Sequence, residues 1–214
     1  MSRNVDPRLV GAVKEVALAN NWDPLDLMTV IGYETAGTYN PWQKGPTTQW
    51  GEHRGLIQWG EPQRADYGVT ADMDVRDQVI AASKYLKDRG LTEGGNLLRM
   101  YAAINGGNVN AINATDEHNG GVSGTVLEKV NSPMMAEHRQ VAARILGTEY
   151  DGGNTYGNGI VPPVNGGEGL VPPIPEDTEV AEEGIVPELK SLGKDILMAG
   201  IKQSMAGTPP PEAV

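Results

Sequence analysis

The sequence predicts a mainly α-helical domain with a small β or loop lobe, followed by an extended tail that carries a C-terminal helix. Three observations support this prediction. Helix-start signals recur through residues 1–150, and a long loop holding three of the four tryptophans interrupts them. Residues 151–214 are instead rich in Gly, Pro and acidic residues, a composition that cannot bury a core. We therefore expect two parts, divided near residue 150.

Five helix starts can be recognised in the first part. A polar residue that caps the backbone N–H groups, often with proline in the first turn, is the typical signal. The starts are Asp6-Pro7, Asp23-Pro24, Asp74, Asn96 and Ser132-Pro133. The corresponding helices are expected to end near Asn20, Gly37, Gly90, Asn105 and Gly147. In the first helix, we expect the apolar residues Leu9, Val13, Val16 and Ala17 to face inward.

Two long loops separate these helices. The first runs from Thr38 to Thr70 and holds Trp42, Trp50 and Trp59. A loop of this length within a compact domain is usually functional or contains small strands. The second runs from Gly106 to Gly124 and is rich in Asn and Gly.

Composition excludes several classes of site. The chain has no cysteine, so disulfides and thiolate metal sites are impossible. The three histidines (His53, His118 and His138) lack metal-ligand spacing, and we expect no metal and no cofactor. No stretch has the length of a membrane span, and the N-terminus has no apolar run, so we expect no signal peptide. The net charge of −11 argues against nucleic-acid binding.

Glu34 is the strongest candidate for a catalytic residue. Counting back by three, four and seven residues gives Ile31, Val30 and Leu27, so its carboxyl lies on the apolar stripe of the second helix. Loss of hydration raises the pKa of such a carboxyl toward the range of a general acid. The alternative is a buried Glu paired with an arginine, and its position alone does not decide between the two.

The tail differs chemically from the first part. Residues 1–150 hold 14 of the 17 basic and 18 of the 28 acidic residues, a balance of −4, whereas residues 151–214 carry −7. The tail repeats the pattern Gly-aliphatic-Val-Pro at 159–162, 169–172 and 184–187. These copies are either a coincidental repeat within a low-complexity segment or short extended segments that dock on a partner. A helix is expected near residues 187–206.

Three segments together resemble the lytic transglycosylases of the lysozyme-like superfamily. They are Tyr33-Glu34-Thr35 with Tyr39-Asn40-Pro41, then Gly55-Leu56-Ile57-Gln58, then Tyr101-Ala102-Ala103-Ile104-Asn105-Gly106-Gly107. The resemblance covers roughly residues 5–147, and the run from Gly55 to Glu61 is most similar to bacteriophage members of the family. It implies a lysozyme-like fold for the first part.

The resemblance also implies roles for single residues. Glu34 matches the catalytic acid/base, and Gln58 and Asn105 match side chains that line the sugar cleft. Thr35 stands where the family usually has Ser, and Trp59 follows the glutamine motif. The family tyrosine beside the asparagine is replaced here by Ile104. Tyr101 shares a helical face with Asn105 and either supplies the missing phenol or is a half-buried core residue.

The activity implied is cleavage of peptidoglycan glycan strands by one glutamate, with closure of a 1,6-anhydro ring. A hydrolase would usually need a second carboxylate, for which Glu52, Glu61 and Asp66 are the candidates. The tryptophans of the first loop suit sugar stacking, although at least one is expected in the core. The phage-like motifs and the tail suggest a virion component that attaches to other virion proteins and opens the cell wall during genome entry. The rivals are a goose-type-lysozyme-like hydrolase and a non-catalytic structural or ejection protein of the particle.

Overall fold

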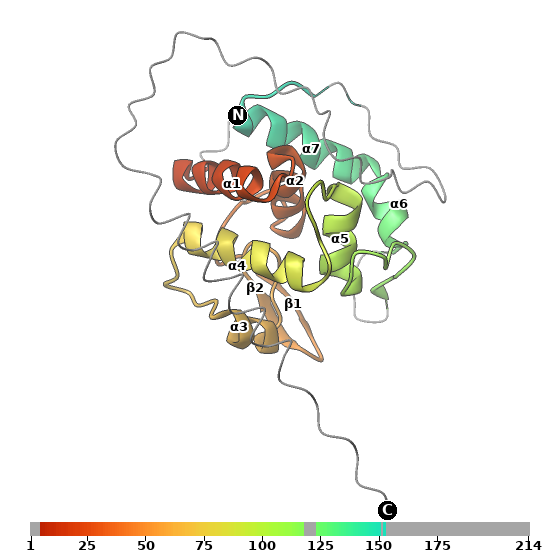
Figure 1. Ribbon diagram of the computed structural model, residues 1–214. Coiled ribbons are helices and arrows are strands. Elements are labelled where there is room, and N and C mark those ends of the chain that lie inside the picture. The colour runs from red at the N-terminus through yellow and green to blue at the C-terminus, as the bar shows by residue number, and fades with distance from the viewer. Residues whose placement is uncertain (1–4, 118–122, 151, 153–214) are drawn as a thin grey trace, which may run out of the picture. The chain divides into compact units, whose positions relative to one another are not determined.

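The computed structural model describes residues 5–117, 123–150 and 152, and this part of the chain is mainly helical with one small sheet (Figure 1). The predicted mainly α class is therefore confirmed for these residues. The elements are α1 Pro7–Asn20, α2 Pro24–Glu34, β1 Lys44–Thr48, β2 Gly51–Arg54, α3 Glu61–Tyr67, α4 Val75–Asp88, α5 Leu97–Gly106, α6 Val126–Val130 and α7 Pro133–Leu146. The expected tail helix near residues 187–206 lies outside the described residues.

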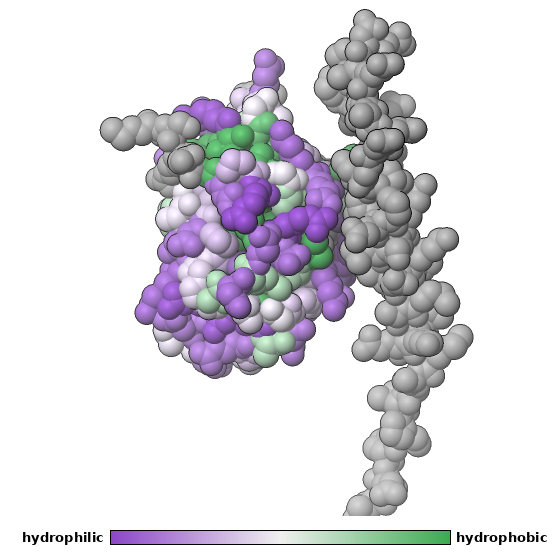
Figure 2. All heavy atoms as spheres, turned by 90° about the vertical axis from the view of Figure 1, so that its left-hand side faces the viewer, coloured by the Kyte–Doolittle hydropathy of each residue, from purple (hydrophilic) through white to green (hydrophobic). Residues whose placement is uncertain are grey.

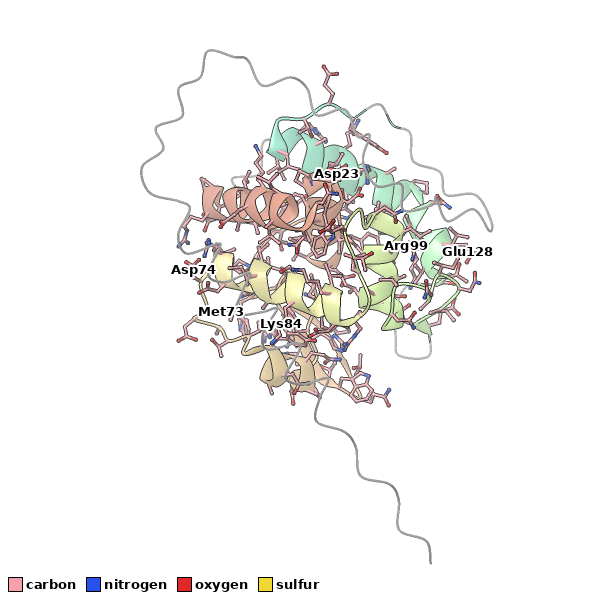
Figure 3. All side chains as sticks on the ribbon, viewed as in Figure 1. Asp23, Met73, Asp74, Lys84, Arg99 and Glu128 are labelled. Carbon is pink, nitrogen blue, oxygen red and sulfur yellow. The ribbon has the colours of Figure 1, made fainter. Side chains whose placement is uncertain are left out.

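The five predicted helix starts are confirmed. Asp23 and Asp74, labelled in Figure 3, begin α2 and α4, and each carboxylate accepts a backbone N–H two residues later at 2.8 Å. Such caps satisfy N–H groups that the helix itself leaves unpaired. The remaining caps are Asp6 of α1, Asn96 of α5 and Ser132 of α7. The side chains expected to face inward from α1 are buried.

Two short helices were not predicted. The first long loop contains α3, which has seven residues, none of them buried, and a glycine at each end. It therefore shows no apolar stripe in the sequence. The second, α6, is five residues long and begins with a capping box between Thr125 and Glu128. That Thr-x-x-Glu signature was present in the sequence.

The first long loop also forms the small β lobe. β1 and β2 pair as an antiparallel hairpin in which Lys44 faces Arg54 and Thr48 faces Gly51. Gly51 has a positive φ of 78°, and a Cβ there would lie 2.3 Å from the Glu61 carboxyl carbon. Glycine at the turn therefore allows α3 to pack closely against the hairpin. In Figure 1 the hairpin and α3 lie together below α4.

Helix α2 is the centre of the core. Every residue from Leu25 to Gly32 is buried, and the helix packs on α1, α5 and α7 (Figure 1). Its buried Asp26 pairs with the buried Arg139 of α7 and accepts the backbone N–H of Leu97 at 3.0 Å. One carboxylate thus links α2 to the start of α5 and to α7.

Polar side chains cover most of the outer surface shown in Figure 2. This agrees with helices whose apolar stripes face inward. Within the described ranges, no helix combines the length and apolar character needed to cross a bilayer.

The buried pair predicts a large effect on stability. Arg139→Met should lower the free energy of unfolding by about 3–5 kcal/mol, because it leaves the Asp26 carboxylate buried without its partner. Adding Asp26→Leu should recover most of that loss, since the uncompensated charge is then gone. Urea unfolding of the two variants measures both effects. A loss below about 1 kcal/mol for Arg139→Met would contradict this account of the pair.

Candidate active site

A cleft of about 760 Å³ lies between the end of α2, the β lobe and α5. It brings together five of the six residues expected at the site, and Thr35 alone is not among its lining residues. The polar and aromatic lining consists mainly of Tyr33, Glu34, Lys44, Thr48, Trp50, His53, Gln58, Trp59, Gln63, Tyr85, Arg89, Tyr101, Asn105, Asp116 and Lys129.

Glu34 is the last residue of α2 and reaches the cleft from the core. Desolvation by burial, which is the largest cause, and the nearby Asp116 carboxylate together raise the pKa of Glu34 from 4.5 to about 8, against the opposing effect of Lys129. The negative end of the α2 dipole also disfavours a charged carboxylate at this position. No arginine pairs with Glu34 in the described part of the chain, which favours the general-acid interpretation over a buried ion pair.

Asp116 is a second carboxylate in the cleft. Its Oδ1 pairs with the ammonium of Lys129, which is buried, and its Oδ2 accepts a hydrogen bond from Asn105 Nδ2 at 2.6 Å. Both carboxylate oxygens are therefore engaged by donors, one of them charged. The arrangement fixes the side chain of Asn105, which comes from the third motif. Asn105 Oδ1 is buried without a protein partner among the described residues.

Two tyrosines stand beside Glu34. The rings of Tyr33 and Tyr101 meet edge to face, with centroids 5.2 Å apart, and their hydroxyl groups interact. Tyr101 is only 2% exposed, and burial together with the neighbouring Glu34 raises its pKa. It is thus both a core residue and a lining residue of the cleft, so the two expectations for Tyr101 are compatible.

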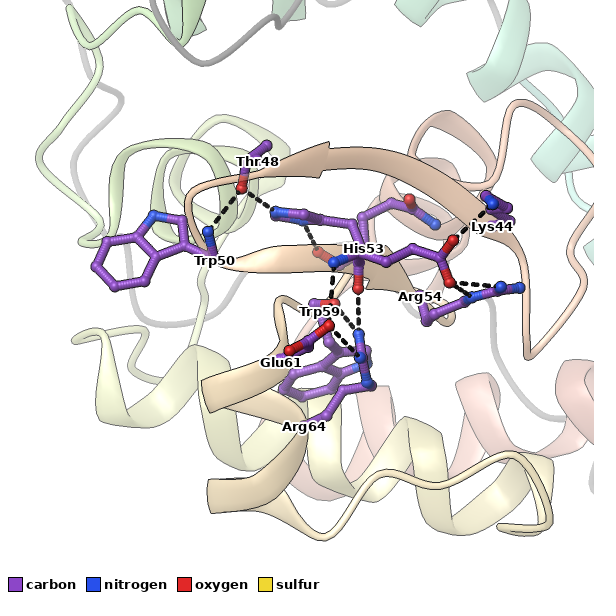
Figure 4. Close-up of polar contacts among 10 residues, drawn as sticks. Lys44, Thr48, Trp50, His53, Arg54, Trp59, Glu61 and Arg64 are labelled. Carbon is purple, nitrogen blue, oxygen red and sulfur yellow. Dashed lines mark hydrogen bonds and ion pairs between the residues drawn. The ribbon is translucent and has the colours of Figure 1, made fainter.

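Gln58 is held against the hairpin by its backbone and side chain. Its carbonyl accepts His53 Nδ1–H at 2.7 Å, and His53 Nε2 accepts the Thr48 hydroxyl at 2.9 Å (Figure 4). Because the Gln58 carbonyl can only accept, the neutral imidazole carries its proton on Nδ1. Gln58 Nε2 donates to the carbonyl of Gly55 at 3.0 Å, while its Oε1 has no partner among the described residues. A Cβ on Gly45 would lie 1.6 Å from that oxygen, so a side chain at residue 45 would displace the Gln58 amide from this position.

The substrate-binding expectation for Thr35 is corrected. Thr35 is fully buried, its hydroxyl donates to the carbonyl of Ile31 at 2.7 Å, and it accepts the N–H of Tyr39 at 3.0 Å. Both capacities of the hydroxyl are used to fix the turn after α2. Thr35 therefore positions the segment that follows Glu34 and does not reach the cleft.

The three loop tryptophans have different environments. Trp59 is 2% exposed and packs with Tyr67 and Tyr85, so its indole is a buried part of the cleft wall. Trp42 lies under the guanidinium groups of Arg54 and Arg64 and does not line the cleft. Trp50 lines the cleft and is 49% exposed, which leaves its ring available for stacking on a sugar.

None of the three expected second carboxylates lines the cleft. Glu52 pairs with Lys44 at 2.6 Å and with Arg54 at 2.5 Å. The Glu61 carboxylate accepts a hydrogen bond from the backbone N–H of Glu52 at 3.3 Å, and Asp66 is exposed on α3. The second carboxylate is instead Asp116, which comes from the Asn- and Gly-rich loop. No local pattern in the sequence distinguishes Asp116 or Lys129, because their proximity to Glu34 depends on how α5 and α6 pack.

No cluster of His, Cys, Asp or Glu in the part of the chain that the structure describes is arranged to hold a metal ion. Comparison with family descriptions, with characterised proteins and with solved structures finds no match for this chain.

The raised pKa of Glu34 predicts a pH-dependent cost to stability. The folded chain binds this proton more tightly than the unfolded chain, so stability is highest below pH 4.5 with respect to this group and falls as pH rises toward 8. Glu34→Gln removes that loss. The stability of Glu34→Gln relative to the wild type should therefore increase by about 2–4 kcal/mol between pH 4.5 and pH 8.5.

Urea unfolding at the two pH values measures this difference. Glu52→Gln is the matched control, because Lys44 and Arg54 lower the pKa of Glu52 and its removal should not stabilise the chain at high pH. A difference between Glu34→Gln and wild type that does not change with pH would contradict the assignment.

Proposed function

We propose that the chain is a lysozyme-like lytic transglycosylase that cleaves the bond between N-acetylmuramic acid and N-acetylglucosamine in peptidoglycan. The main support is a single observation: a carboxyl group that holds its proton near neutral pH ends a buried helix inside a cleft large enough for sugar rings. Gln58 and Asn105, the amide residues of the other two motifs, line the same cleft.

A pKa of about 8 suits a group that must act first as an acid and then as a base. Protonated Glu34 donates its proton to the glycosidic oxygen, and the bond to the leaving sugar breaks as an oxocarbenium-like centre forms. The N-acetyl group of the muramic acid assists at that centre. The carboxylate of Glu34 then accepts the proton of the sugar's own 6-hydroxyl, whose oxygen closes the 1,6-anhydro ring. Glu34 ends protonated, and no water is consumed.

Asp116 is the observation that favours hydrolysis as the second candidate. Hydrolytic glycosidases usually use two carboxylates on either side of the scissile bond, and Asp116 lines the cleft with Glu34. However, its two oxygens are occupied by Lys129 and Asn105. A carboxylate held in this way is a poor base for water and a poor nucleophile, which favours the transglycosylase.

The rival from another class is a structural or ejection protein that keeps the fold without cutting. Such a protein has no need to keep a desolvated carboxyl at some cost to stability. Glu34, Gln58 and Asn105 are all present in the cleft, which supports an enzyme.

The enzyme is proposed to be carried in a phage particle and to act on the host cell wall during genome entry. Its attachment to other virion proteins is assigned to residues 151–214, which lie almost entirely outside the described residues. Three Gly-aliphatic-Val-Pro copies would each bind weakly. In series they raise the effective concentration of one another and give firm attachment. The charge of −7 on this segment suits a basic or mixed receiving surface.

Cleavage of purified sacculi tests the proposed chemistry. Glu34→Gln should fold and lose at least about 10²–10⁴-fold in activity, since the acid and base step depends on one group. Mass spectrometry of the wild-type products should find 1,6-anhydro-muramic ends. Reducing muramic ends as the main product would instead establish the hydrolase, with Asp116 as the partner base. Absence of cleavage by the folded wild-type chain would favour the structural protein.

Removal of the tail tests the proposed attachment. A chain truncated after Tyr150 should cleave sacculi at the rate of the full chain, because the lining residues of the cleft that the structure describes all lie before that point. It should fail to enter phage particles when it replaces the full chain during assembly, as measured by immunoblot of purified particles. Normal packaging of the truncated chain would reject the docking role of residues 151–214.

A further inference from the structure

Three long basic side chains among the described residues line the cleft, and they differ in how their charge is balanced. Lys44 pairs with Glu52 at 2.6 Å, and Lys129 pairs with Asp116. Arg89 has no carboxylate within ion-pair distance among the residues that the structure describes. The cleft therefore holds a guanidinium whose charge is not neutralised by a direct partner.

The Arg89 side chain is also held in place. Arg89 caps the C-terminal end of α4, and its guanidinium carbon lies 4.3 Å from the centroid of the Tyr85 ring. Tyr85 is itself packed edge to face against Trp59 and Tyr67, at centroid separations of 5.3 and 5.4 Å. The neighbouring Asp88 accepts the Tyr67 hydroxyl at 2.8 Å. Tyr85 also forms a side-chain hydrogen bond with the guanidinium, which has five N–H donors, so the stacked group keeps further donors available at its edge.

The two carboxyl groups that line the cleft in the described part of the chain do not pair with the Arg89 guanidinium. Glu34 holds its proton, and the oxygens of Asp116 are engaged by Lys129 and Asn105, so neither carboxyl is a direct partner of Arg89. An arginine in this setting matches a carboxylate, which it can bind with two parallel hydrogen bonds.

We propose that Arg89 binds a carboxylate of the substrate and makes the cleft select muramyl glycan strands over neutral chito-oligosaccharides. This inference rests on the proposed function and specifies its substrate. N-acetylglucosamine has no carboxyl group. N-acetylmuramic acid carries a lactyl carboxyl, which is free on stripped strands and joined to a stem peptide on intact ones, and that peptide carries carboxylates of its own. Arg89 is therefore a specificity-determining residue, separate from the acid and base chemistry of Glu34.

Binding measured by calorimetry tests the proposal without turnover. The full chain carrying Glu34→Gln is titrated with chito-oligosaccharide, with peptide-free muramyl strands and with peptide-bearing muramyl strands of matched length. We expect at least one muramyl ligand to bind about tenfold or more tightly than the neutral ligand, as for a hydrogen-bonded charged pair. Arg89→Gln should bring the ligands to near equality and leave chito-oligosaccharide binding unchanged. Lys87→Gln removes the same charge from an exposed position outside the cleft, and it should keep the preference.

The results separate the possible explanations. A preference that persists on peptide-free strands assigns the lactyl carboxylate, and a preference restricted to peptide-bearing strands assigns the stem peptide. The proposal would be overturned if the chain with an intact Arg89 bound all three ligands with equal affinity. It would also be overturned if Arg89→Gln weakened the affinity for all three ligands equally. Cleavage of sacculi by the wild type is measured in parallel. A carboxylate preference without any cleavage would reject the enzyme while leaving the role of Arg89 intact.

Discussion

The enclosure of α2 by α1, α5 and α7 is the constraint on which the rest of the structure depends. An ionisable group on a helix that is buried on nearly all sides must either be paired with an opposite charge or be held in its neutral form. Asp26, near its start, is paired with Arg139 and a backbone N–H. Glu34, at its end, has no cationic partner in direct contact among residues 5–117 and 123–150 and instead holds its proton. The same burial thus produces a structural ion pair at one end of the helix and a candidate acid at the other.

The surroundings of Glu34 follow from this arrangement. Thr35 uses its hydroxyl to fix the turn after α2, and this turn leads into the β lobe that forms one wall of the cleft. On the opposite side, Asp116 is held by Lys129 and Asn105 and keeps a negative charge near Glu34. Burial supplies most of the change in the pKa of Glu34, and Asp116 adds to it. The two carboxyl groups of the cleft thus have different electrostatic environments, since one is desolvated and the other is held by a cation and an amide.

The sequence predicted the parts of the site that depend on local pattern. Capping residues located the five long helices, and the apolar stripe before Glu34 identified its partly buried position. The site residues that were missed, Asp116, Lys129 and Arg89, occupy a loop, a five-residue helix and a helix end. Their roles depend on which side chains lie close together across the cleft. The periodicity of apolar residues in the sequence does not predict such long-range contacts. Thr35 is a residue that the sequence placed in the site and the structure does not. Its hydroxyl lies next to Glu34 in the sequence, but it is hydrogen-bonded to the backbone of Ile31 and Tyr39.

The most direct test of this account is the titration of the Glu34 carboxyl carbon by NMR. The account predicts a midpoint near pH 8 in the full chain, and a lower midpoint in Asp116→Asn, since removal of that charge removes one of the two causes that raise the pKa. A wild-type midpoint near 4.5, the ordinary value for a glutamate, would contradict the claim that burial keeps this carboxyl protonated.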